Sequence, residues 1–84
     1  MATWVITGAN RGLGLEFAKQ LLAVGHTVLA GVRHPESMEF EHAHMKVFQL
    51  DVASTTSVNE FAKHIKSVTD SIDVLVNNAG RMDG

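Results

Sequence analysis

The sequence predicts an α/β fold in which a parallel β-sheet carries helices on both faces. Two observations predict this class. Short apolar runs alternate with segments of helical periodicity along the 84 residues, and the first run enters a helical segment through a glycine-rich turn. Such alternation is typical of parallel sheets, because each parallel strand is reached through a crossover connection that is usually a helix. A composition of 45% hydrophobic and 19% charged residues is that of a globular core.

The first three elements form a strand–helix–strand unit. Residues 4–6 are a short apolar run typical of a strand that is buried on both faces. Helical spacing follows, carried by Leu13, Phe17 and Leu21. Gly25 stands where a glycine is expected at the C-terminus of this helix. A second apolar run over residues 26–32 completes the unit, whose crossover should be right-handed.

The rest of the chain predicts two further strands and a second helix. Residues 36–44 predict either one or two helical turns or a loop, and residues 47–50 predict the third strand. An apolar stripe then predicts a helix of about three turns. Its members are Val58, Phe61, Ala62, Ile65 and Val68. Residues 54–57 supply N-cap candidates, with Ser57 and Glu60 at the spacing of a capping box. Residues 72–76 predict the fourth strand.

Composition excludes several classes of protein. With no cysteine, the chain has neither disulfides nor thiolate zinc sites. Seven basic and nine acidic residues give a net charge of −2, which argues against nucleic acid or an anionic membrane as a main partner. There is no secretory signal pattern at the N-terminus and no apolar run of about 18 residues, so we expect a cytoplasmic location.

A metal site is the weakest of the chemical possibilities. His42 and His44 have Glu39 and Glu41 nearby. Ligands two residues apart suit a strand, and no strand is predicted there. We therefore expect no metal site.

The strongest local pattern is Thr-Gly-Ala-Asn-Arg-Gly-Leu-Gly at residues 7–14, between the first strand and the first helix. A helix N-terminus presents unpaired N–H groups and positive dipole to a phosphate. In this interpretation Gly8 makes the tight turn, Gly12 lets the backbone approach a pyrophosphate, and Gly14 lets the helix pack closely on the sheet. The alternative is a turn that is merely tight.

This glycine turn, together with Asn-Asn-Ala-Gly at residues 77–80, resembles the short-chain dehydrogenase/reductase family. The residues of the glycine turn are also similar to those of carbonyl-reductase-like and C-factor-like members. The resemblance covers the whole chain and implies a Rossmann-type doubly wound sheet with strand order 3-2-1-4, truncated after the fourth strand. Residues 1–84 are then expected to be the incomplete N-terminal dinucleotide-binding part of a single domain.

The resemblance and the local chemistry together assign a set of cofactor-binding residues. They are Gly8, Asn10, Arg11, Gly12, Leu13, Gly14, Arg33, Asp51, Val52, Asn78, Ala79 and Gly80.

The charges near the second strand indicate the cofactor. A site that prefers NAD places an acidic residue after this strand, but no Asp or Glu occurs between Glu16 and Glu36. Arg33 follows the strand and Arg11 lies in the glycine turn, and a guanidinium can bind a phosphate through two hydrogen bonds. NADP(H) is therefore favoured over NAD(H). The alternative for Arg33 is a solvated loop charge.

Two further positions gain roles from the resemblance. The Asp51 carboxylate would accept from the adenine amino group, and the Val52 backbone would meet the ring. The alternative is that Asp51 only caps a turn. Asn77 would help to tie the sheet together and residues 78–80 would line the cofactor ribose, although a purely structural role for both asparagines is equally open.

The resemblance implies an oxidoreductase that transfers a hydride between the nicotinamide cofactor and a small carbonyl or alcohol substrate. Family members use a Tyr, a Lys four residues later and a Ser, all beyond the Asn-Asn-Ala-Gly motif. The chain contains no tyrosine, so we assign no catalytic residue and expect the chain alone to be inactive. A noncatalytic nucleotide-binding or protein-interaction module is the alternative. Strand order 3-2-1-4 also leaves the fourth strand at an edge, which predicts self-association.

Overall fold

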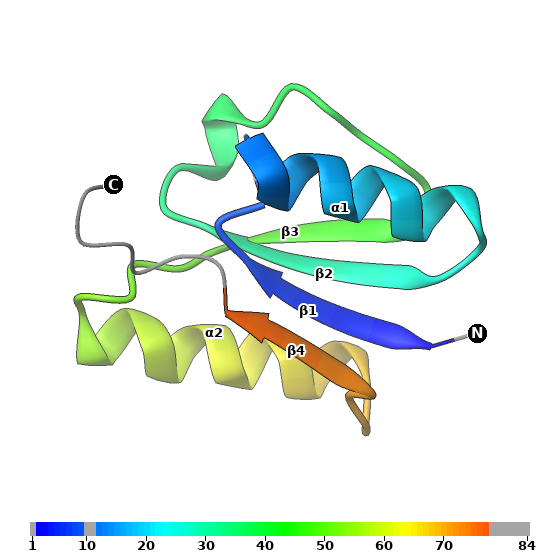
Figure 1. Cartoon of the computed structure of the whole chain (residues 1–84). Helices are drawn as coiled ribbons and strands as arrows, with labels where there is room; N and C mark the ends of the chain where they lie inside the picture. The colour runs from blue at the N-terminus through cyan, green and yellow to red at the C-terminus, as the bar shows by residue number, and fades with distance from the viewer. Residues whose placement is uncertain (1, 10–11, 78–84) are drawn as a thin grey trace.

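Four parallel strands form the central layer (Figure 1). The structure is a computed structural model that describes residues 2–9 and 12–77. The strands are β1 (Thr3–Thr7), β2 (Thr27–Val32), β3 (Met45–Gln49) and β4 (Val74–Asn77). They pair in the order β3-β2-β1-β4, which confirms the predicted fold class and strand order.

One helix covers each face of the sheet (Figure 1). Helix α1 (Gly12–Ala23) packs on the face that carries Ile6 and Val28, and helix α2 (Thr55–Val68) packs on the face that carries Val5 and Leu29. The alternation of side chains along β1 and β2 produces these two cores, because successive residues of a strand point to opposite faces. As expected of an inner strand, β2 is buried along almost its whole length.

The buried face of α1 differs from the predicted stripe. Leu13 is 86% exposed, whereas Gly14, Ala18, Leu21 and Leu22 are buried. Small residues at positions 14 and 18 face the sheet, so the buried stripe begins one residue later than the large side chains suggest. Phe17 lies at the margin, with its ring edge-on to Trp4 at 5.5 Å between centroids.

The apolar stripe of α2 is also narrower than predicted. Phe61 and Ile65 are buried, while Val58 and Val68 are about two-fifths exposed and Ala62 is exposed. The N-cap is Ser54, one of the predicted candidates, since the Ser57 N–H donates to Ser54 Oγ at 3.2 Å and the helix begins at Thr55. The capping box predicted at Ser57 was therefore wrong.

The remaining boundaries shift by one or two residues. Strand β3 begins at Met45 and not at residue 47, and β4 begins at Val74 and not at residue 72. Residues 36–44 begin within a 3-10 turn, η1 (Pro35–Ser37), and continue as a loop. Within this loop Phe40 packs on the α1 side of the sheet, and Lys19 Nζ lies 5.2 Å from the centre of its ring.

No helix in the described part of the chain has the length and apolar character needed to cross a membrane. Likewise, residues 2–9 and 12–77 contain no cluster of three metal-ligating side chains. His42 and His44 do contact one another, since the His44 N–H donates to His42 Nδ1 at 3.0 Å.

Candidate cofactor-binding site

The carboxyl ends of the four strands meet at one edge of the sheet, on the left of Figure 1. Backbone pairing continues past the strand ends. The Gly8 N–H donates to the Gly31 carbonyl oxygen at 2.7 Å, and the Leu50 N–H donates to the Val32 carbonyl oxygen at 2.7 Å. The glycine turn and the segments after β2 and β3 are therefore brought to a common edge, where open parallel sheets bind their ligands.

The glycine turn has the backbone geometry that its sequence suggests. Gly8 and Gly12 have φ angles of +70° and +63°, in the left-handed region that favours glycine. A Cβ added to Gly12 would meet no atom within 4 Å, so this glycine borders open space at the start of α1. Gly14, by contrast, is buried against the sheet. Asn10 and Arg11 lie outside the described residues.

These features fit a phosphate group of a dinucleotide. The first turn of α1 carries no acidic side chain that would repel an anion. The open side of Gly12 leaves the backbone accessible there, and Leu13 points away from the protein. The residues present could therefore hold a pyrophosphate at the N-terminus of α1.

Asn77 links β4 to β1. Thr7 Oγ1 donates to Asn77 Oδ1 at 3.2 Å, and these residues are also register partners in the sheet. The first asparagine of the second motif is thus joined to the threonine of the first motif. Asn78, Ala79 and Gly80 lie outside the described residues.

Asp51 forms the turn between β3 and α2. Its Oδ1 accepts from the Ala53 N–H at 3.0 Å, and its carbonyl oxygen accepts from the Ser54 N–H at 2.9 Å. The turn-capping role considered for Asp51 is therefore present. Oδ2 has no hydrogen-bond partner among the described residues, so one carboxylate oxygen can still accept from a ligand. Val52, next to it, is exposed.

Arg33 follows β2 at the same edge and is exposed. The nearest acidic residue in the sequence, Glu36, lies 3.6 Å from His34 Nδ1 through its Oε2. Within the described part of the chain, Arg33 forms no ion pair. Its exposed guanidinium is available to an anion. The same exposure is typical of a solvated loop residue, so both roles considered for Arg33 remain open.

Gly31 supports this edge, although it is not among the site residues predicted from the sequence. A Cβ at Gly31 would lie 2.9 Å from Leu50 Cδ2 and 2.9 Å from the ring of Phe61. The absence of a side chain lets Leu50 and Phe61 close over β2, and Leu50 immediately precedes Asp51. A glycine inside an apolar strand signals such a close approach, and this signal was available in the sequence.

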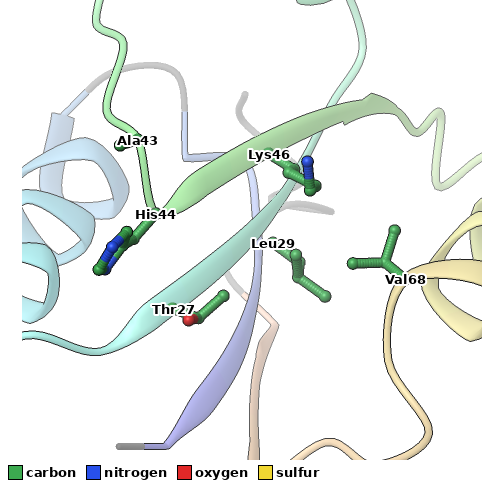
Figure 2. Close-up of a pocket in the computed structure, with 6 residues that line it drawn as sticks. All are labelled: Thr27, Leu29, Ala43, His44, Lys46 and Val68. Carbon is green, nitrogen blue, oxygen red and sulfur yellow. The ribbon is translucent and has the colours of Figure 1, made fainter.

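A hollow of about 190 Å³ lies at the other end of the strands. Its lining comprises Thr27, Leu29, Ala43, His44, Lys46 and Val68 (Figure 2). Thr27 begins β2 and His44 precedes β3, which places the hollow toward the amino edge of the sheet. It is separate from the candidate cofactor site.

The strand order and the glycine turn define an open parallel α/β protein of the class that binds ligands at the carboxyl edge. Comparison with known protein families shows to which family of this class the chain belongs. The family described as short chain dehydrogenase matches residues 2–84. The chain belongs to the short-chain dehydrogenase family.

Individual relatives agree with this assignment. An uncharacterized oxidoreductase of Schizosaccharomyces pombe is 37% identical over 79 residues, which cover 94% of this chain and 27% of the relative. A short-chain dehydrogenase from Streptomyces avermitilis has a TM-score of 0.87 at 30% identity, covering 96% of this chain and 32% of its own. A short chain dehydrogenase from Burkholderia cenocepacia J2315, in complex with NADP, has a TM-score of 0.77 at 31% identity, covering 94% of this chain and 32% of its own. The chain thus spans less than a third of the length of these proteins.

Proposed function

We propose that this chain is the dinucleotide-binding part of an oxidoreductase, and that it binds NADP(H) at the carboxyl edge of its sheet. The observation that carries the proposal is Gly12, which has a positive φ and open space on its Cβ side at the start of α1. This is the position at which a backbone must approach a pyrophosphate closely.

In this proposal, three parts of the chain bind different groups of the cofactor. The N-terminal turn of α1 holds the pyrophosphate, the free oxygen of Asp51 accepts from the adenine amino group, and residues 78–80 line the ribose. When bound, the nicotinamide supplies or accepts a hydride for a small carbonyl or alcohol substrate. The residues of this chain bind and orient the cofactor, and in the absence of tyrosine the chain alone does not catalyse the reaction.

The preference for NADP(H) rests on charge. No acidic residue follows β2 before Glu36, and the Glu36 carboxylate lies beside His34. The exposed guanidinium of Arg33 can therefore meet a 2′-phosphate without a competing carboxylate at the strand end. A solved relative in complex with NADP supports the binding of this cofactor, and the preference over NADH rests on the charges alone.

The test is a titration of the full chain with NADPH and with NADH, followed by nicotinamide fluorescence. NADPH should bind more tightly than NADH. Gly12→Ala should weaken both by about ten-fold or more, because its Cβ occupies the space left for the pyrophosphate. Gly25→Ala is the matched control, since Gly25 also has a positive φ, of +98°, at the opposite end of α1. Equal loss in both variants, or no binding by the unmodified chain, would contradict the proposal.

We further propose that β4 mediates self-association. It lies at the end of the sheet and pairs only with β1 among the described strands. Leu75, in the middle of β4, is 64% exposed. An apolar edge strand of this kind is a template for pairing with another chain.

A further inference from the structure

The first turn of α2 holds the backbone of Asp51. The Asp51 N–H donates to Ser57 Oγ at 2.8 Å, the shortest of the side-chain contacts in this turn. Ser57 receives this hydrogen bond from a residue six positions earlier, across the connection between β3 and α2. The hydrogen bonds that Asp51 accepts, from the N–H groups of Ala53 and Ser54, come from residues two and three positions later in the chain.

Ser57 is itself held in place by the packing of α2. Ser57, Phe61 and Ile65 are spaced by four residues, so they share one face of the helix. Phe61 and Ile65 are buried against Val5 and Leu29 of the sheet. The core packing of Phe61 and Ile65 therefore fixes the position of the Ser57 hydroxyl. Through its hydrogen bond, this hydroxyl in turn fixes the position of the Asp51 backbone.

The same turn leaves one particular carboxylate oxygen available. Oδ1 of Asp51 is occupied by the Ala53 N–H, while Oδ2 has no partner among the described residues. If the Asp51 backbone were free to move, the carboxylate would move with it, and the oxygen not bound by Ala53 would not keep one fixed direction. The hydrogen bond to Ser57 opposes that movement, because it holds the backbone nitrogen that is bonded to the Cα carrying the side chain.

We infer that Ser57 is a positioning residue for cofactor recognition: by accepting from the Asp51 N–H, it keeps Asp51 Oδ2 available to the adenine amino group. The inference rests on the proposed function, because it requires a dinucleotide at this edge. Ser57 acts through Asp51 and does not itself contact the cofactor. Ser57 therefore contributes to the selection of adenine over other bases, and not to the affinity for every dinucleotide.

The experiment compares NADPH with deamino-NADPH, in which hypoxanthine replaces adenine and a carbonyl oxygen replaces the amino group. Dissociation constants of the full chain for both cofactors are measured by nicotinamide fluorescence. The unmodified chain should prefer NADPH by about ten-fold or more, as expected for a hydrogen bond to a charged group. In Ser57→Ala this preference should fall to within about three-fold. Ser57→Thr, which retains the hydroxyl, should keep it.

Two variants separate positioning from loss of structure. Ser54→Ala removes the N-cap hydroxyl of the same turn and should lower the melting temperature, yet it should retain the preference for NADPH. Ser57→Cys conserves the shape of the side chain but offers only a weak acceptor, so it should lose the preference while remaining folded.

Each result decides the inference. If Ser57→Ala and Ser57→Cys discriminate as strongly as the unmodified chain, Ser57 does not position Asp51, and the proposed function stands without it. If Ser54→Ala loses the preference equally, the effect is general loosening of the turn and the inference is wrong. If the unmodified chain binds neither cofactor, the proposed function fails and the inference fails with it.

Discussion

Thr7 and Asn77 stand 70 positions apart in the chain, yet Thr7 Oγ1 donates to Asn77 Oδ1 at 3.2 Å. The hydrogen bond joins β1 to β4 at the carboxyl edge of the sheet. It couples the glycine turn that follows Thr7 to the asparagine motif that begins at Asn77. The two sequence motifs therefore share one structural support.

Asn77→Ala should destabilise the chain by about 1 kcal/mol, because it removes a hydrogen bond that the largely buried Thr7 hydroxyl donates. The free energy of unfolding can be measured in urea through the fluorescence of Trp4, the single tryptophan. Asn59→Ala is the matched control, since Asn59 lies exposed on α2. Equal stability of the two variants would show that the Thr7–Asn77 hydrogen bond contributes nothing.

Gly31→Ala should destabilise the chain by about 1–3 kcal/mol, the usual range for overpacking a core. The added methyl group would lie 2.9 Å from both Leu50 and Phe61, so at least one of them must move. A double-mutant cycle with Phe61→Leu provides the check. The cost of Gly31→Ala should shrink when Phe61 is replaced, and a cost that stays the same would place the strain elsewhere.

Arg33→Asp should weaken NADPH binding by about ten-fold or more relative to NADH binding, because it replaces a phosphate-binding guanidinium with a repelling carboxylate. Titration of both cofactors measures the ratio. Lys66→Asp makes the same change of charge in the last turn of α2 and should leave the ratio unaltered. A similar loss for both cofactors in Arg33→Asp would remove Arg33 from the 2′-phosphate site.

Leu75→Lys should shift the chain from oligomer to monomer, because a charged side chain on an edge strand opposes pairing between chains. Size-exclusion chromatography with light scattering measures the mass. Val24→Lys is a suitable control, since Val24 is 60% exposed just beyond α1 and away from β4. An unmodified chain that is monomeric at high concentration would contradict the proposed self-association.

The apolar runs of the sequence predicted the strands well, and the motifs predicted the edge to which the site belongs. Residues 4–6 and 26–32 were recognisable because strands buried on both faces are continuously apolar. Strand order came from the known order of doubly wound Rossmann sheets, since local patterns contain no information on which strands become neighbours.

The details that failed depend on contacts between elements. Leu13 has the size and spacing of a core residue, but the small residues Gly14 and Ala18 bring the opposite flank of α1 onto the sheet. Ser57 has the spacing of an N-cap, but its hydroxyl accepts from Asp51 and the cap is Ser54. Neither contact is visible in a linear pattern, because each depends on how a helix is placed against the strands.

Hydrogen–deuterium exchange with and without NADPH shows at which edge of the sheet the cofactor binds. Binding at the carboxyl edge should slow exchange at residues 7–14 and 51–54 and leave exchange around Thr27 and His44, at the amino edge, unchanged. Protection around Thr27 and His44 without protection of the glycine turn would contradict it.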